Sequence, residues 1–225
     1  MRALFLTTLV TLTLFSSTLD DKKERYSASE VPKNMTVEVK KERFFSLLVP
    51  AVNRVYSGLM AQYLSVKSDM QKGLGAKRIE ELKIKYKAKT DLELLVALKP
   101  HPKSLALAQA AMESNWGTSR FFVQANNVFG MWSVNKNDKR IAASFRRDGT
   151  KTIWLKKFDS LEDSVKAYYL LMSKGRAYKR FRAVRYESND VFKMVKKLDK
   201  YSELGAVYGE RLSGIIRYNK LTKYD

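Results

Sequence analysis

The stretch that decides the fold is Ser104-Leu-Ala-Leu-Ala-Gln-Ala-Ala-Met-Glu-Ser-Asn-Trp-Gly-Thr-Ser-Arg120, with Asn126-Asn-Val-Phe-Gly-Met-Trp132 close behind it. Its first part is apolar and rich in alanine, which predicts a helix whose small side chains let other elements pack closely. Trp116-Gly117 is expected to stop this helix, because glycine is common just past a helix C-terminus. Glu113, at its far end, must be paired, solvated or functional, since burying an unpaired charge is costly. The local pattern alone does not decide between a functional role and a water-facing helix end.

Composition limits the chemistry that the chain can perform. The 225 residues fit one sizeable domain, or a domain with an appendage. The net charge of +20 favours an anionic partner, such as nucleic acid, anionic lipid or cell wall. There is no cysteine and only one histidine, His101, so thiol nucleophiles, histidine-based zinc sites and Ser-His-Asp triads are poorly supported. Hydrolytic chemistry therefore falls to carboxylates, and we expect neither a metal nor another cofactor.

The N-terminus has the pattern of a signal peptide. Met1-Arg2 is followed by an apolar run at residues 3–15 and then by Ser16-Ser17-Thr18. We assign residues 1–18 to the signal peptide, with cleavage near 17–19. The run is too short to span a bilayer comfortably, and an uncleaved N-terminal anchor is the alternative. The expected location is the periplasm or cell envelope, which argues against nucleic acid as the partner.

The N-terminal part of the mature chain is predicted to be helical. Residues 19–37 have little periodicity and are interpreted as a mobile linker. Apolar residues recur at helical spacing from about 40 to 70, and Pro50 is expected to kink this long helix or split off its first turns. A charged helix at 76–87 and a short helix capped by Thr90-Asp91 follow. The predicted domains are a linker and helical accessory segment at 19–88 and a catalytic domain at 89–225.

The catalytic segment combines helices with one small β insertion. Residues 131–158 show short strand patterns around turns, and Asp148-Gly149 is a hairpin-turn signal, so Asp148 is more readily a turn residue than an acid catalyst. Ser160-x-x-Asp163 predicts the start of the next helix. The basic run at 174–200 is interpreted as a solvated face.

Two motifs carry a family resemblance. The Ala-x-x-Glu-Ser-x-Trp-Gly pattern that ends at Gly117 and the Asn-Asn-x-Phe-Gly pattern that ends at Gly130 occur in a specific order and spacing. Together they resemble the core of the bacterial cell-wall β-N-acetylglucosaminidase family (the glucosaminidase domain), most closely its Bax-protein-like subgroup. The resemblance covers roughly 89–225. It implies a mainly α, lysozyme-like α+β fold, with a small β-hairpin lobe over a cleft and a long N-terminal helical segment in front.

The resemblance also implies site residues. Glu113 matches the catalytic general acid, whose carboxyl needs a pKa raised by an apolar setting. Tyr168 and Tyr208 match aromatic positions of the cleft, where they would line a sugar groove or assist the reaction; core packing is the alternative. The residues implied in substrate binding are Ser114, Trp116, Asn126, Asn127, Phe129 and Trp132.

The second carboxylate of the family has no clear counterpart. Many members have a glutamate in the β lobe, but the matching stretch at 141–149 has none. Asp138 and Asp148 are the nearby acids. Either one of them substitutes, or the 2-acetamido group of the substrate acts as internal nucleophile, or water attacks with weak help. The stereochemical outcome therefore stays open.

The predicted function is an exported peptidoglycan hydrolase that cleaves β-1,4 bonds after N-acetylglucosamine, with a basic surface suited to anionic murein. A muramidase-type wall lysozyme is the close alternative, since one glutamate in a helical cleft serves either bond. A catalytically weak wall-binding or scaffolding module is a rival of another class. A nucleic-acid-binding protein is disfavoured, because no binding motif for nucleic acid is recognisable. The oligomeric state is not determined by these patterns.

Overall fold

The computed structural model describes residues 26–143 and 152–225, so the predicted signal peptide and Asp148 lie outside the described residues. The described chain is mainly helical with one small antiparallel sheet, as expected. The helices are α1 (Val37–Lys72), α2 (Ala76–Tyr86), α3 (Asp91–Leu98), α4 (Lys103–Glu113), α5 (Arg120–Ala125), α6 (Leu161–Lys174), α7 (Lys179–Glu187), α8 (Val191–Val195) and α9 (Ala206–Tyr218), with 3-10 turns η1 (Arg176–Tyr178) and η2 (Leu221–Tyr224).

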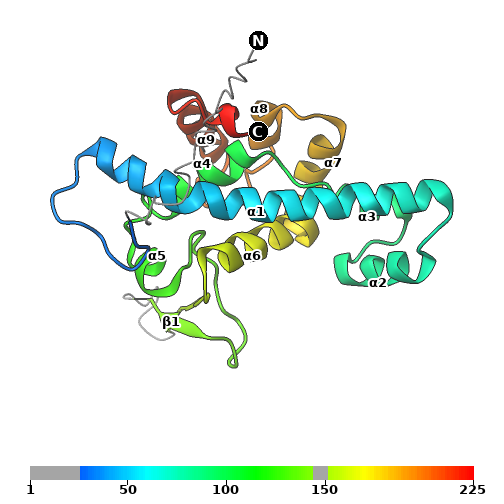
Figure 1. Cartoon of the computed structure of the whole chain (residues 1–225), viewed down its shortest axis with the longest axis horizontal. Coiled ribbons are helices and arrows are strands. Elements are labelled where there is room, and N and C mark those ends of the chain that lie inside the picture. The colour runs from blue at the N-terminus through cyan, green and yellow to red at the C-terminus, as the bar shows by residue number, and fades with distance from the viewer. Residues whose placement is uncertain (1–25, 144–151) are drawn as a thin grey trace, which may run out of the picture.

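The long helix α1 runs across the whole molecule (Figure 1), between α6 on one side and the group of α4, α8 and α9 on the other. The Thr36 hydroxyl caps its start by accepting a hydrogen bond from the Val39 backbone N–H, and Gly73 ends it in the left-handed conformation (φ 67°). Pro50 lies inside this continuous helix, so the expectation that it splits off the first turns is wrong. By length and hydropathy α1 also resembles a membrane span, but its apolar residues contribute to the core.

The core is built around α4, because its alanines allow neighbouring helices to approach closely. Ala106, Ala108, Ala110 and Ala111 are all buried, and α1, α9 and η2 pack against this helix. Phe44 and Leu48 of α1 belong to the same apolar cluster as the residues of the C-terminal helices. A second, smaller cluster lies where α1 meets α2 and α3. The N-terminal helix therefore shares one core with the predicted catalytic segment.

The β lobe is a pair of short antiparallel strands, β1 (Arg140–Ala142) and β2 (Trp154–Lys156), in which Ile141 pairs with Leu155. At the start of the stretch 131–158, which was expected to form short strands, there is only a single bridge between Trp132 and Leu155. Arg120 of α5 donates to the Ala142 carbonyl at 2.6 Å, which ties the lobe to the helical body. The lobe is thus anchored close to the second motif of the sequence.

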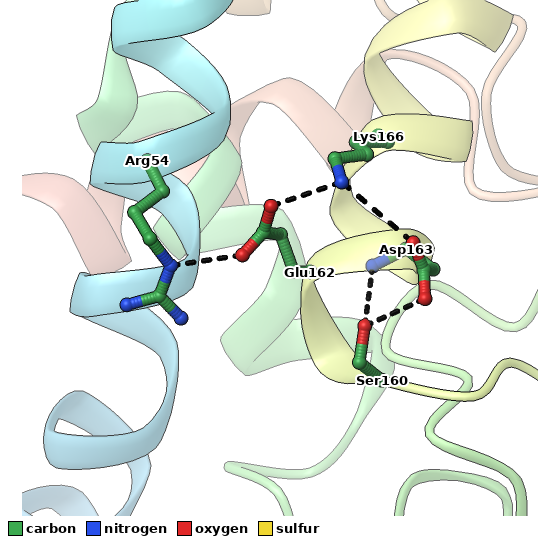
Figure 2. A network of polar contacts seen from close by, with 5 residues as sticks. All are labelled: Arg54, Ser160, Glu162, Asp163 and Lys166. Atoms are coloured by element: carbon green, nitrogen blue, oxygen red, sulfur yellow. Dashed lines mark hydrogen bonds and ion pairs between the residues drawn. The ribbon is translucent and has the colours of Figure 1, made fainter.

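The predicted start of α6 is confirmed. The Ser160 hydroxyl accepts a hydrogen bond from the Asp163 N–H at 3.1 Å and lies 2.7 Å from the Asp163 carboxylate. Figure 2 shows how this cap continues into ion pairs, because Glu162 contacts both Arg54 of α1 (2.8 Å) and Lys166 (2.9 Å). These pairs are exposed, so each contributes at most about 1 kcal/mol.

The basic run at 174–200 is only partly a solvated face. Arg185 of α7 is fully buried and donates to the carbonyls of Val96 and Ala97 at the end of α3. Its burial lowers the pKa of its guanidinium to about 9. Arg182 donates to the carbonyls of Met172 and Gly175. The prediction was wrong for these two arginines, because their side chains satisfy carbonyls at helix ends instead of water.

Candidate active site

Glu113 is the last residue of α4, and an unusual turn follows it. Asn115 (φ 51°), Trp116 (φ 59°) and Gly117 (φ 72°) are all left-handed, a conformation that costs roughly 1–2 kcal/mol for each non-glycine residue. The helix thus ends earlier than Trp116-Gly117, where the sequence suggested a stop. The Ser114 hydroxyl holds the turn by donating to the Ala110 carbonyl (2.6 Å) and accepting from the Gly117 N–H (2.8 Å). Ser114 is buried and therefore shapes this helix end, without a hydroxyl left for a sugar.

Arg43 of α1 clamps the turn from the other side. Its buried guanidinium donates to the Gly117 carbonyl at 2.8 Å. The same side chain donates to the carbonyls of Ser27, Ala28 and Glu30, so residues 27–30 of the expected mobile linker are bound to the body. A buried arginine that bonds four carbonyls couples α1, the N-terminal segment and the turn behind Glu113.

Trp116 packs inward. Its ring makes edge contacts with Phe44 (5.2 Å between centroids) and Phe45 (5.9 Å), and the Lys41 ammonium lies 5.0 Å from it. This half-buried ring packs against the apolar core cluster, so Trp116 supports the turn from the side of α1.

The Glu113 carboxyl is half-buried and carries one hydrogen bond from a tyrosine. The Tyr208 hydroxyl donates to Oε1 at 2.8 Å. Burial raises the pKa of the Glu113 carboxyl, and the hydrogen bond from Tyr208 lowers it by a smaller amount. Because burial dominates, Glu113 holds its proton to higher pH than a solvated glutamate does. A general acid needs this property near neutral pH.

Tyr208 is itself held in place by Tyr201, by Gln109 and by the packing of α9 on α8. Its ring, 1% exposed, stacks on Tyr201 (5.2 Å between centroids, 19° between planes), and Gln109 Nε2 donates to its hydroxyl at 2.9 Å. The next residue, Gly209, lets α9 approach α8, because a Cβ there would lie only 2.6 Å from the Val195 carbonyl oxygen. Close helix packing therefore sets the position of the hydroxyl that meets Glu113.

Tyr168 is fully buried and cannot line a groove. Its ring stacks on Phe129 (3.9 Å, 7°), and its hydroxyl bonds Gln109 Oε1 and lies 3.0 Å from His101 Nε2. The core-packing alternative thus describes the ring, while the hydroxyl reaches Glu113 only through Gln109 and Tyr208. The same stack places Phe129 in the core.

The two asparagines of the second motif support the lobe. The Asn127 side chain is buried, donates to the carbonyls of Met131 and Lys156, and accepts from the Met131 N–H. Asn126 ends α5 with φ 49° and donates to the Phe158 carbonyl at 3.1 Å. Trp132 differs from the other predicted binding residues, because 58% of its surface is exposed. It is the ring of this set best placed to meet a ligand.

Burial and the Tyr208 hydrogen bond are the influences on the pKa of Glu113 that the described residues give, and no second carboxylate is among them. Asp138 Oδ2 accepts from the Ser133 hydroxyl at 2.9 Å and lies 3.6 Å from the Lys156 ammonium. These contacts hold it within the β lobe, and Asp148 lies outside the described residues. Across residues 26–143 and 152–225, no group of three or more His, Asp or Glu side chains is arranged to bind a metal ion.

A cavity elsewhere lacks comparable chemistry. It has a volume of about 470 Å³ and lies between the α2–α3 connection and α7, with Tyr86, Leu92 and Arg182 among its lining residues. Its acid, Glu93, accepts a hydrogen bond from the Lys89 N–H at 2.7 Å and so closes the local loop. We therefore assign the candidate site to Glu113 and not to this cavity.

Sequence reasoning missed three residues that support the site: Arg43, His101 and Gln109. Gln109 had a usable signal, because it precedes Glu113 by four residues and so shares its helix face in an otherwise apolar run. The signal for His101 was only that it is the one histidine in the sequence. Arg43 had no distinguishing signal, since many lysines and arginines surround it in the sequence.

A half-buried carboxylic acid at a helix end can serve as the general acid of a glycoside hydrolase, and the family match below assigns the chain to this class. The family described as mannosyl-glycoprotein endo-beta-N-acetylglucosaminidase (Glucosaminidase) matches residues 93–221, and the chain belongs to this family. The family expected from the two motifs is thereby confirmed.

Protein bax and the autolysin Auto are two of the proteins that are similar to this chain. Protein bax of Escherichia coli (strain K12) is 30% identical over 125 residues, which are 53% of this chain and 43% of that protein. The chain thus spans less than half the length of this relative. The catalytic domain of the autolysin Auto from Listeria monocytogenes has a similar structure, with a TM-score of 0.51, 18% identity, and coverage of 87% of this chain and 90% of that one. At this identity the likeness concerns the fold, which agrees with the expected class.

Proposed function

We propose that this protein cleaves β-1,4 glycosidic bonds after N-acetylglucosamine in peptidoglycan strands, with Glu113 as the general acid. The observation that carries the proposal is the half-buried Glu113 carboxyl, whose pKa is raised by burial and whose Oε1 accepts a hydrogen bond from Tyr208. Membership of the glucosaminidase family supports the bond class. The net charge of +20 suits a polyanionic wall.

In the proposed reaction, the Glu113 carboxyl donates its proton to the glycosidic oxygen as the bond between that oxygen and the sugar C1 breaks. The sugar develops oxocarbenium-like positive charge, and the departing oxygen leaves as a hydroxyl. Water then adds to C1 and releases its second proton to solvent; alternatively, the 2-acetamido oxygen first closes onto C1, and water opens this ring as its proton returns to the Glu113 carboxylate. The exposed ring of Trp132 offers an apolar face on which a sugar can stack.

The test is digestion of purified sacculi by the wild type and by Glu113→Gln, with mass spectrometry of the released ends. Glu187→Gln makes the same chemical change at an exposed helix end and serves as the control. Reducing N-acetylglucosamine ends that vanish only in Glu113→Gln are the expected result. Reducing muramic ends would identify a muramidase instead, and pelleting on sacculi without solubilisation would identify a wall-binding module. Full activity of Glu113→Gln would refute the acid role.

The second catalytic group is tested separately with Asp138→Asn and Asp148→Asn. An essential carboxylate should cost far more than tenfold in rate. A loss below about tenfold, or ~1.4 kcal/mol, in both variants would leave the acetamido group or unassisted water as the nucleophile.

We further propose that residues 1–18 direct export to the cell envelope, that 19–88 are an accessory segment, and that 89–225 are the catalytic domain. The match at 93–221 supports the last of these boundaries. The intact mass of the protein recovered from envelope fractions tests export. Loss of 17–19 residues is expected, whereas a full-length mass would favour the uncleaved anchor.

A further inference from the structure

A chain of buried side chains extends from Glu113 into the core. Tyr208 donates to Glu113 Oε1, and Gln109 Nε2 donates to Tyr208. Tyr168 donates to Gln109 Oε1, and His101 Nε2 lies 3.0 Å from the Tyr168 hydroxyl. Apart from Glu113, every member is almost completely buried. The chain crosses from α9 through α4 and α6 to the loop before α4.

The number of hydroxyl protons fixes the donor and the acceptor of each hydrogen bond in this series of side chains. Each tyrosine hydroxyl has a single proton, and Tyr208 gives its proton to Glu113, so Tyr208 can only accept from Gln109. Tyr168 gives its proton to Gln109 Oε1. The remaining contact of Tyr168 must therefore be a hydrogen bond that its oxygen accepts, and His101 Nε2–H is the donor within reach.

His101 has the protonation state that this direction requires. Burial, with a smaller contribution from the nearby Arg185 guanidinium, holds the pKa of His101 well below its usual range. The ring is therefore neutral, carries one N–H and stacks on Tyr169 at 4.3 Å. Nδ1 has no hydrogen-bond partner among the described residues. With the proton on Nε2, no N–H is left buried and unpaired at Nδ1. Such an unpaired donor would destabilise the protein by its desolvation free energy.

We propose that Gln109 and His101 are positioning residues for the general acid: they orient the chain so that Tyr208 donates to Glu113 Oε1 and the acid proton resides on Oε2. No described residue makes a hydrogen bond to Oε2, so among the described contacts Oε2 is the oxygen that is free to hold the acid proton. If the Gln109 amide were reversed, its oxygen would take the Tyr208 proton and Glu113 would lose its donor. The catalytic meaning of this arrangement rests on the proposed function, but the direction of the chain does not.

Few groups other than Tyr208 can change the pKa of Glu113. Four tyrosines interact electrostatically with Glu113, and all are phenols whose raised pKa values keep them neutral at working pH: Tyr208, Tyr201, Tyr178 and Tyr168, from α9, the loop before α9, η1 and α6. Burial and the Tyr208 hydrogen bond are the two influences on the pKa of Glu113. A change in that hydrogen bond should therefore appear directly in the titration of Glu113.

The experiment is an NMR titration of carboxyl-labelled glutamate in the full-length protein without substrate, with the Glu113 signal identified by Glu113→Gln. Tyr208→Phe, which removes the donor, should raise the titration midpoint of Glu113 by about one pH unit, or tenfold in acid strength. Gln109→Met, which keeps the shape of the side chain but not its hydrogen bonds, should raise the midpoint by a few tenths of a pH unit. The reason is that the bond from Tyr208 to Glu113 loses the strengthening by its neighbour, which is roughly 10–30% for a hydrogen bond. Gln71→Met, at an exposed position of α1, is the control.

A double variant separates the proposed role from mere packing. If Gln109 acts through Tyr208, Gln109→Met should no longer move the Glu113 midpoint when Tyr208→Phe is already present. An unchanged midpoint in Gln109→Met, or an equal shift in both backgrounds, would overturn the proposal. If Gln109→Met does not fold, Tyr168→Phe keeps the stack on Phe129 but frees the amide to reverse, and it is held to the same criteria. The titration needs no activity. It can therefore support the positioning role even if the sacculus digestion refutes the proposed function, and it can refute the positioning role even if the digestion supports that function.

Discussion

Replacing Gly209 by alanine should destabilise the protein, whereas replacing Gly214 in the same helix should not. Both residues lie in α9, and both substitutions add one methyl group to a helical backbone. Alanine favours a helix over glycine by roughly 0.5–1 kcal/mol, so both variants gain this amount locally. The two positions differ only in what the new methyl group meets.

The structure sets the difference between the two variants. At position 209 the added Cβ would lie 2.6 Å from the Val195 carbonyl oxygen and 3.1 Å from its carbon, which is closer than real Cβ atoms come. Since these are backbone atoms, α8 and α9 must move apart. Such overpacking costs about 1–3 kcal/mol, which exceeds the local gain. At position 214 nothing lies within 4 Å, so the gain remains.

Urea unfolding of the wild type and both variants measures the effect, provided that the dependence on urea concentration is unchanged. We expect a lower midpoint for Gly209→Ala and an equal or higher midpoint for Gly214→Ala. In thermal unfolding, 1 kcal/mol corresponds to roughly 2–4 °C for a chain of this size. The same displacement of α9 should lengthen the 2.8 Å bond from Tyr208 to Glu113, and so raise the Glu113 titration midpoint.

A Gly209→Ala variant as stable as Gly214→Ala would refute the reasoning. It would mean that α8 and α9 have room for a methyl group, and that their packing does not set the position of Tyr208. A loss of stability in both variants would likewise contradict it, because position 214 has no neighbour to explain a cost.

Three further predictions concern other parts of the site. Arg43→Lys should lower the free energy of unfolding by about 2–3 kcal/mol, since an ammonium cannot bond the four carbonyls, whereas Arg54→Lys, at an exposed ion pair, should cost below about 1 kcal/mol; urea unfolding compares them. Because burial raises the folded-state pKa of Glu113, the folded form binds the proton more tightly, and stability is lost as pH rises from the unfolded value of 4.5 through the folded pKa. Glu113→Gln should therefore raise the melting temperature relative to the wild type more at pH 8 than at pH 4, and an equal effect at both would contradict the raised pKa. Trp132→Ala should weaken pelleting on sacculi by about two- to tenfold, with unchanged melting because the ring is 58% exposed; unweakened pelleting would exclude a binding role for this ring.

Local patterns predicted much of the secondary structure. Thr90 caps α3 and Ser160 caps α6, each through a side-chain bond to a nearby backbone N–H group. Such interactions span two or three residues and are written directly in the sequence. Pro50 does not divide α1, because the tertiary packing of this helix outweighs the cost of one proline in a long helix.

Side-chain burial was less predictable for the charged residues. Arg43 and Arg185 have ordinary basic surroundings in the sequence, yet both are fully buried. Their partners are carbonyl oxygens at turns and helix ends, and any residue type can supply a carbonyl. Sequence patterns therefore contain no sign of which arginine will leave the surface.

The sequence by itself determined that Glu113 is the carboxylate at the end of an alanine-rich helix, and that the family motif surrounds it. Only the tertiary structure decided what that carboxylate touches. Tyr208 is 95 residues away, and Gln109 joins it to Tyr168 and His101 in an order that depends on which atoms face one another. Directed hydrogen bonds require positions within a few tenths of an ångström, and helix packing across the core sets those positions.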